Sequence, residues 1–279
     1  MREIHVSDIT AKVAELCIRA CVVVAPDIRA CMECSLAAET GLAKQVLGDM
    51  LKNQDIAIEK GLPICQDTGL TVVFVEIGQD VRVTGGPIAQ AIHDGVAQGY
   101  TEGYLRKSVV NDPYHRTNTG DNTPAVIHYD MVAGDKLRIT VCPKGFGSEN
   151  MSRLKMFVPA DGMAAVEKFV METVTLADAN PCPPIVVGVG VGGTFDYAAN
   201  MAKRALLRKI GSSHPDPHWA DMEQRLLVQI NATGIGPAGF GGATTAMAVH
   251  INTYATHIAG LPVAVNLGCH VNRHEEAVL

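Results

Sequence analysis

Aromatic residues are scarce in this sequence, and so are clusters of positive charge. Phe, Tyr and Trp make up 5% of the 279 residues, so a binding face built on aromatic side chains is not expected. No run of Lys and Arg is present, and the net charge of -6 provides no electrostatic footprint for nucleic acid. Hydrophobic residues at 47% and charged residues at 19% are nevertheless typical of a folded globular protein.

Long hydrophobic runs are also missing. The N-terminal MREIHVSDITAKVAELC lacks the apolar stretch of a signal peptide, and no apolar run reaches the ~20 residues that span a bilayer. The longest candidate, Ile185 to Gly193, is interrupted by glycines and indicates a buried strand. We therefore expect a cytoplasmic protein whose thiols stay reduced. Its eight cysteines are then core residues, metal ligands or catalytic groups rather than disulfides.

Hydrophobic periodicity predicts an α/β fold, with a helical N-terminal part followed by a mixed sheet with surrounding helices, in one domain over residues 1–279. Helical spacing covers residues 7–58, and a second helix is predicted from about Ser35 to Lys60. LTVVFVEIG (70–78) and DVRVTGG (80–86) indicate two strands joined by a short turn, and residues 125–145 indicate a hairpin. Further helices are expected at 85–105, 161–177, 194–210 and 219–232, and strands at 183–190 and in the last third of the chain.

Three glycines form a literal G-x-G-x-x-G between a predicted strand and a predicted helix. They are Gly188, Gly190 and Gly193, and this context is the one required of a dinucleotide site. In such a site the next ~20 residues lead to a second strand that ends in an acidic ribose ligand. Here a basic helix and a proline-rich loop follow. We therefore favour a helix N-terminus that binds some other anion over an NAD site.

Most of the cysteines are interpreted as packing residues. Cys31 and Cys34 form a C-x-x-C pair, which by itself is compatible with redox chemistry or with half of a zinc site. No second pair is present, and Cys17 and Cys21 precede this one at helical spacing. Buried thiols in helix packing are the preferred interpretation, and Cys142 in a predicted strand receives the same one.

The histidines are interpreted in the same structural sense. His128, His250 and His257 lie in strand-like or apolar surroundings and are predicted to be core or supporting groups. His214 and His218, in the SHPDPH loop, are able to bind a metal, but surface exposure is the preferred interpretation.

Three cysteines differ from the rest. Cys65 in PICQDTG, Cys182 in NPCPP and Cys269 in LGCHVNRH each follow an apolar segment, in a loop beside Pro or Gly. Structural zinc sites use four ligands, and electron-transfer iron–sulfur clusters use four thiolates. Three thiolates from separate loops can instead hold a [4Fe–4S] cluster whose open iron acts on a substrate as a Lewis acid. From spacing alone, this is one hypothesis among several.

The surrounding motifs are longer and more specific. They are PICQDTG, NTGDNTPA, KGFGSENMSRL, CPPIVVGVGVGG, GIGPAGFGG and LPVAVNLGCHVNRH. From about residue 5 to the end, the sequence resembles the α-subunit, or N-terminal domain, of class I fumarases and L-tartrate dehydratases. The resemblance implies that Cys65, Cys182 and Cys269 ligate a catalytic [4Fe–4S] cluster with one iron open to substrate. It also implies reversible addition of water to a dicarboxylate, and sensitivity to oxygen.

The resemblance assigns further roles to neighbouring residues. Gln66 and Asp67 are expected to contact substrate, with Asp67 in the acid–base relay, and Arg106 in GYLRKSVV to clamp a substrate carboxylate. A surface charge near a helix end is the alternative for Arg106. The loop KGFGSEN (144–150) is expected to offer backbone N–H groups to the same anion, and this adds Gly145, Ser148, Glu149 and Asn150. Residues 118–124, NTGDNTP, are interpreted as structural.

More than one function is compatible with these residues. We place (S)-malate and fumarate ahead of L-tartrate and oxaloacetate as the substrate pair. A β-subunit on a separate chain is expected to complete the site, in an α2β2 or other hetero-oligomer, and without it the chain should be nearly inactive. The alternatives from other classes are a non-catalytic iron–sulfur sensor and an NAD-dependent oxidoreductase.

Overall fold

The computed structural model describes all residues from 1 to 279, and the chain divides into two compact units. Unit 1 comprises residues 1–24, 53–146 and 273–279, and unit 2 comprises residues 25–52 and 147–272. Both combine helices with a mixed sheet, which confirms the predicted α/β class. The assignment of the whole chain to one domain stays a prediction. None of the helices is both long and apolar enough to cross a membrane.

Unit 1 is built on a four-stranded sheet with the order β10-β5-β2-β4. Strand β2 (Leu70–Gly78) pairs in parallel with β4 (Val126–Val132) and antiparallel with β5 (Leu137–Lys144). Strand β10 (Glu275–Val278) adds to the far edge of β5. A separate parallel pair joins β1 (Arg2–His5) to β3 (Val81–Thr84).

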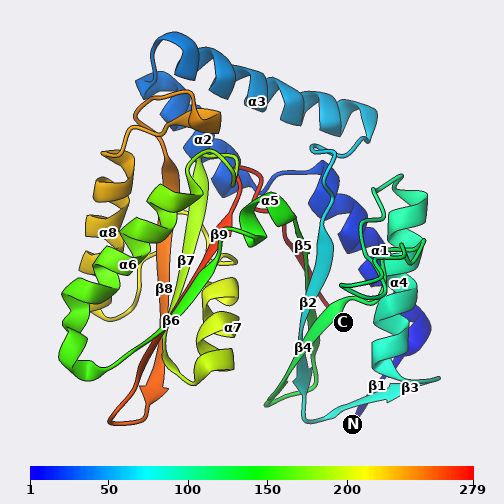
Figure 1. Ribbon diagram of the computed structural model, residues 1–279. Helices are drawn as coiled ribbons and strands as arrows, with labels where there is room; N and C mark the ends of the chain where they lie inside the picture. The colour runs from blue at the N-terminus through cyan, green and yellow to red at the C-terminus, as the bar shows by residue number, and fades with distance from the viewer. The chain divides into compact units, whose positions relative to one another are not determined.

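The helices α1 (Val6–Val22) and α4 (Ile88–Glu102) cover one face of this sheet (Figure 1). Apolar side chains of both helices pack on alternate residues of β2 and β5, which form the core of unit 1. Three glycines spaced four apart, Gly95, Gly99 and Gly103, let the two helices approach closely. A Cβ on Gly99 would lie 2.8 Å from the carbonyl oxygen of Ala14.

Unit 2 begins with helices α2 (Pro26–Ala38) and α3 (Gly41–Lys60), and α3 continues into unit 1. The short helix α5 (Phe146–Glu149) begins at the last residue of the 53–146 segment of unit 1 and leads into the second segment of unit 2. The sheet has the order β6-β9-β7-β8. Its strands are β6 (Arg153–Phe157), β7 (Ile185–Gly193), β8 (Ala246–Thr256) and β9 (Leu261–Gly268), and only β7 and β8 pair in parallel.

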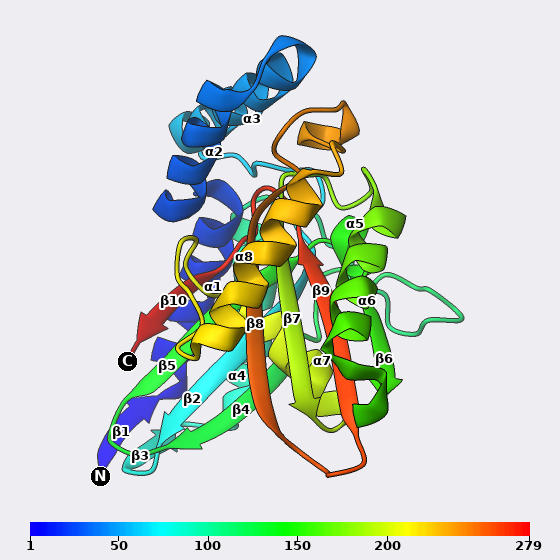
Figure 2. The same ribbon diagram turned by 90° about the vertical axis from the view of Figure 1, so that its left-hand side faces the viewer.

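Helices lie on both faces of the unit 2 sheet (Figure 2). Helices α6 (Gly162–Ala177) and α8 (Pro217–Asn231) bury their apolar sides against the valines of β7, which point to one face. Helix α7 (Phe195–Ala205) packs on the opposite face, where β7 presents Gly188 and Gly190. A Cβ on either glycine would collide with the α7 backbone, at Ala202 O and Ala198 O respectively. These glycines therefore permit close helix–strand packing.

Two predictions of local structure are wrong, the continuous second helix and the hairpin at 125–145. The second predicted helix is interrupted, because α2 ends at Ala38 and α3 starts at Gly41. The two strands predicted at 70–78 and 80–86 are confirmed as β2 and β3, although β3 pairs with β1 and not with β2. The predicted hairpin at residues 125–145 has both strands, but β2 lies between them.

Candidate active site

The loop of Cys65 in unit 1 links α3 to β2 and is anchored at both sides. The N–H of Ile64 donates to the carbonyl of Cys21 on α1 at 2.9 Å, and Asn53 on α3 donates its side-chain amide to the carbonyl of Ile64 at 2.8 Å. Cys65 is half-buried and forms no disulfide, and the N–H of Asp67 donates to its sulfur at 3.4 Å. N–H donation of this kind is what thiolate ligands of iron–sulfur clusters accept.

Asp67 is the most firmly held polar side chain of this loop. Its Oδ1 accepts from the N–H of Gly69 at 3.0 Å and its Oδ2 from the N–H of Phe146 at 2.9 Å. The carboxylate is thus fixed between its own loop and the residues that follow β5. A fixed carboxylate of this kind suits an acid–base group, because its position does not have to be found during the reaction.

Arg273 lies beside Asp67 and was not predicted as a site residue. A Cβ built on Gly145 would lie 3.2 Å from Oδ2 of Asp67 and 3.1 Å from Nη2 of Arg273. Both side chains therefore border the space that the missing side chain of Gly145 leaves open. The sequence signal was present, since Arg273 belongs to the motif LGCHVNRH, but only the cysteine of that motif was singled out.

Arg106 follows α4 and belongs to the same part of unit 1 as the Cys65 loop. Its carbonyl accepts from Oγ1 of Thr68 at 3.0 Å, while its side chain is exposed. Tyr100 on α4 donates its hydroxyl to the carbonyl of Thr68 at 2.7 Å. The Arg106 side chain is therefore exposed on a backbone that a hydrogen bond holds to Thr68, the residue after Asp67. Gln66, on the same loop, is exposed as well.

Residues 118–124 act as a support, in agreement with their structural interpretation. Asn122 is fully buried, and its Oδ1 accepts from the N–H groups of Ser108 at 2.7 Å and Val109 at 3.2 Å. Its amide nitrogen donates to the carbonyl of Gly69 at 3.2 Å. One side chain therefore ties the segment after Arg106 to the end of the Cys65 loop.

In unit 2 the structure brings the loops of Cys182 and Cys269 together. The N–H of His270 donates to the carbonyl of Cys182 at 3.2 Å, and its Nδ1 lies 3.3 Å from the same oxygen. Cys182 is exposed and Cys269 half-buried, and neither forms a disulfide. Cys182 also has a φ of 55°, a conformation that non-glycine residues adopt rarely and that often marks a functional site.

The predicted anion loop is divided between the units. Gly145 lies in unit 1, whereas Ser148, Glu149 and Asn150 lie in unit 2. The Glu149 carboxylate accepts from Nζ of Lys203 at 2.6 Å and from Nδ2 of Asn266 at 2.9 Å. It lines a cavity of about 190 Å³ together with Lys203 and Asn266. Lys203 thus balances the charge of Glu149, and the predicted contact of this carboxylate with substrate stays a prediction.

Some of the remaining cysteines and histidines are buried as predicted, and others are exposed. Cys17, Cys21 and Cys142 are buried as expected, and burial raises the pKa of the Cys21 thiol to about 11, so it stays protonated. Cys34 is exposed, so its predicted burial is wrong, and His257 is exposed rather than in the core. Within neither unit do three or more His, Cys, Asp or Glu side chains converge on one metal position.

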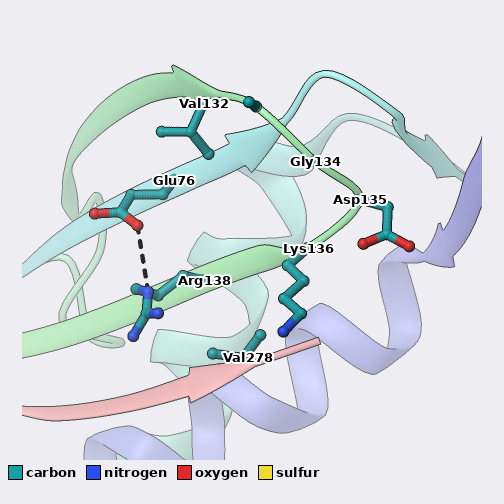
Figure 3. A pocket seen from close by; sticks show the side chains of 8 residues that line it. Glu76, Val132, Gly134, Asp135, Lys136, Arg138 and Val278 are labelled. Carbon is teal, nitrogen blue, oxygen red and sulfur yellow. Dashed lines mark ion pairs between the residues drawn. The ribbon is translucent and has the colours of Figure 1, made fainter.

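A larger cavity of about 330 Å³ lies at the opposite end of β2 from the Cys65 loop (Figure 3). Residues of the turn between β4 and β5 line it, together with Arg138 and Glu76, which form an ion pair at 3.2 Å. None of the predicted site residues lines it. We therefore do not assign the active site to this cavity, although it is larger than the one beside Glu149.

Comparisons with known proteins agree with the motifs. The sequence model of the family described as "Fumarate hydratase (Fumerase)" matches residues 10–278. The chain is 40% identical over 267 residues to the "Putative L(+)-tartrate dehydratase subunit alpha" of Methanocaldococcus jannaschii, covering 94% of each chain. It is 35% identical over 241 residues to "L(+)-tartrate dehydratase subunit alpha" of Escherichia coli strain UTI89, covering 85% of this chain and 79% of the other.

Proposed function

Because the chain belongs to the fumarate hydratase family, we propose that it is the alpha subunit of a hydro-lyase that interconverts (S)-malate and fumarate. The observation that carries the proposal is the held carboxylate of Asp67 in the loop of Cys65. Loss of water from malate requires a proton to leave C3 and the hydroxyl to leave C2 with its electron pair. A carboxylate fixed by two backbone N–H groups is suited to moving such protons.

The neighbouring residues of unit 1 supply groups for the rest of the substrate. Arg106 is exposed beside the loop, and its forked guanidinium matches a carboxylate with two charge-assisted hydrogen bonds. Arg273 borders the same space at Gly145 and adds a second positive charge. Gln66 offers an amide donor and acceptor from the Cys65 loop itself. Unit 1 thereby offers two positively charged side chains, Arg106 and Arg273, to a dianionic four-carbon substrate.

Three cysteines would hold a [4Fe–4S] cluster: Cys65, Cys182 and Cys269. The donor set fits, because these cysteines form no disulfide and are at least partly exposed, and because Cys65 sulfur already accepts an N–H. When bound, the cluster supplies a Lewis-acidic iron that makes the C2 hydroxyl a better leaving group. Cys65 comes from unit 1 and the other two from unit 2, on the loops that His270 joins. An iron of this kind is open to oxidation, so we propose that air inactivates the enzyme.

The named relatives favour a second candidate, the dehydration of L(+)-tartrate. Tartrate differs from malate by one hydroxyl at C3, so selection between the two depends on a polar contact at that carbon. The relatives are also named as alpha subunits. We therefore propose a beta subunit on a separate chain, in an α2β2 or other hetero-oligomer, that supplies further residues to the site.

Anaerobic reconstitution tests the cluster and its ligands. The chain is loaded with iron and sulfide, and its iron content is compared with that of Cys65→Ser, Cys182→Ser and Cys269→Ser. Each of these variants is expected to lose most of its bound iron, whereas Cys34→Ser, at an exposed cysteine of α2, keeps the wild-type amount. Equal iron in all four variants would contradict the ligand assignment.

Substrate identity is tested on the same material together with the co-expressed beta subunit. The EPR spectrum of the reduced cluster is recorded with malate, fumarate or L-tartrate, and turnover is followed with each. A malate-dependent shift with turnover supports the first candidate, and a response to tartrate alone selects the second. A cluster that responds to no diacid would support a sensor, and nicotinamide binding without a cluster would support an oxidoreductase.

A further inference from the structure

A buried carboxylate far from Cys182 in sequence is connected to the loop of Cys182 by hydrogen bonds. Glu39 directly follows α2 and is 3% exposed. Its Oε1 accepts from the N–H of Ala243 at 2.9 Å and from that of Thr244 at 2.7 Å, and its Oε2 lies 3.1 Å from the N–H of Ala243. A buried charge is costly unless hydrogen bonds of this kind compensate it, so the carboxylate and these two amides depend on each other.

The amides that Glu39 binds close a glycine loop, defined as residues 234–244. Gly239, Gly241 and Gly242 have φ angles of 78°, 81° and 131°, which only glycine adopts easily. A Cβ on Gly242 would lie 2.8 Å from Oε2 of Glu39, so the absence of a side chain lets the carboxylate reach the backbone. A loop rich in glycine loses much conformational freedom on folding, and the bonds to Glu39 help to hold it in one conformation.

The glycine loop in turn holds the residues that follow Cys182. The N–H of Ala238 donates to the carbonyl of Pro183 at 2.8 Å. Immediately after the loop, the carbonyl of Thr245 accepts from the N–H of Ile185 at 2.9 Å. The two bonds lie one and three residues after Cys182 and so define where its backbone lies. All of these residues belong to unit 2.

We propose that Glu39 is a positioning residue for Cys182, acting through the glycine loop. The inference rests on the proposed function, because it takes Cys182 as a cluster ligand. Glu39→Gln keeps the size of the side chain but replaces one acceptor oxygen with an NH2 donor that faces the same amides. The glycine loop then loses part of its fixation, and the sulfur of Cys182 is held less well. Groups that orient a ligand typically change metal affinity by about 10- to 100-fold.

The test compares release of iron from the reconstituted full chain to a chelator under anaerobic conditions. Glu39→Gln is expected to release iron about tenfold faster than wild type, with an altered EPR signal of the reduced cluster, and Glu39→Asp to restore part of the difference. Glu223→Gln is the matched control. Glu223 is also buried in unit 2 and accepts from the N–H groups of His214 and Ile251 and from the Arg208 guanidinium at 2.6 Å, but it makes no hydrogen bond to the glycine loop.

Each outcome has one meaning. Fast release in Glu39→Gln with wild-type release in Glu223→Gln supports the inference. Equally fast release in both variants overturns it, because a general loss of stability then explains the effect. Wild-type release in Glu39→Gln overturns it as well. Should Glu39→Gln fail to fold, Gly242→Ala displaces the carboxylate without removing it and is expected to show the same fast release; wild-type release there overturns the inference. A wild-type chain that takes up no cluster refutes the proposed function instead.

Discussion

His250 is a buried histidine of β8 whose surroundings disfavour its charged form. It is 1% exposed, and its Nδ1 lies 3.2 Å from the carbonyl oxygen of Ala205. Burial lowers its pKa from the usual 6.5 to about 4, and Arg208 adds to this, while Glu223 and Asp27 oppose it. His250 is therefore neutral at physiological pH, as its predicted core position requires.

This histidine makes stability depend on pH in a defined window. Between pH 6.5 and about 4 the unfolded chain binds a proton at His250 and the folded chain does not. Stability from this group is complete above pH 6.5 and is lost as the pH falls towards 4, by on the order of 3 kcal/mol. Urea unfolding of wild type and His250→Gln from pH 7 to 4.5 is expected to show a shallower fall in the variant. His218→Gln, at an exposed histidine, should keep the wild-type slope; parallel slopes for all three proteins would exclude this role.

The contacts of individual site residues could be predicted from sequence only where the partner is a few residues away in the chain. The local contacts of Asp67 are of the kind that sequence can indicate, because Gly69 and the Cys65 sulfur lie within two residues of it; its role in catalysis stays a prediction. The contact of Glu149 with substrate stays a prediction, and its ion pair with Lys203, which is 54 residues away, could not be predicted. Long-range partners of this kind leave no mark in the local pattern of one sequence.

Gly99 in α4 and Gly48 in α3 both lie inside a helix, but replacement of each by alanine is expected to change stability in opposite directions. Gly99 in α4 faces α1, where an added Cβ would lie 2.8 Å from the carbonyl oxygen of Ala14 and 3.0 Å from Cβ of Cys17. Gly48 in α3 has only Cδ1 of Leu36 within reach, at 3.9 Å, which is an ordinary contact. Contacts of the first kind require the helices to move apart.

We expect Gly99→Ala to destabilise the protein and Gly48→Ala to stabilise it. The first change forces overpacking between α1 and α4, at a cost of about 1–3 kcal/mol. The second gains helix propensity, about 0.5–1 kcal/mol, without a clash. Chemical denaturation of both variants measures the difference. A Gly99→Ala protein as stable as Gly48→Ala would show that the helix contact yields easily.

At the level of elements, the sequence predicted most strands and helices but not how the strands pair. Residues 126–132 and 137–144 have the pattern of a hairpin, yet their connection crosses the end of β2. Gly78 makes this crossing possible, because a Cβ there would collide with the carbonyl of Gly134, and its N–H donates to Lys136 at 2.9 Å. The helix α4 between β2 and β4 indicates the strand pairing better than the hairpin pattern does, because a crossover helix favours parallel pairing of the strands that flank it.

At the scale of the whole molecule, neither unit is a continuous piece of sequence. Unit 1 takes its β10 from the last residues of the chain, and β10 pairs with β5. Leu279 and Leu137 exchange two backbone hydrogen bonds at 2.8 and 3.0 Å, and Glu276 pairs with Arg138 at 2.7 Å. Periodicity could predict a strand at such a position only weakly, because four residues are too short for a pattern.

Removal of residues 275–279 is expected to destabilise unit 1. The deletion exposes the edge of β5 and removes several backbone hydrogen bonds, each worth about 1 kcal/mol. Glu276→Ala, which removes only a half-exposed ion pair, should cost less than about 1 kcal/mol. Thermal unfolding and hydrogen exchange of the β5 amides distinguish the two. A deletion variant whose β5 amides are still protected would show that β10 is dispensable.

The position of β10 also sets an order for folding during synthesis. The ribosome delivers the N-terminal residues first, and domains generally fold in the order in which they emerge. Here the sheet of unit 2 is complete once residue 268 has emerged. The first strand of the unit 1 sheet emerges far earlier, but its last strand, β10, is complete only when residue 278 has emerged. The unit that begins first therefore finishes last. Until then β5 presents an unpaired edge, and an unpaired edge is a template for pairing with another chain.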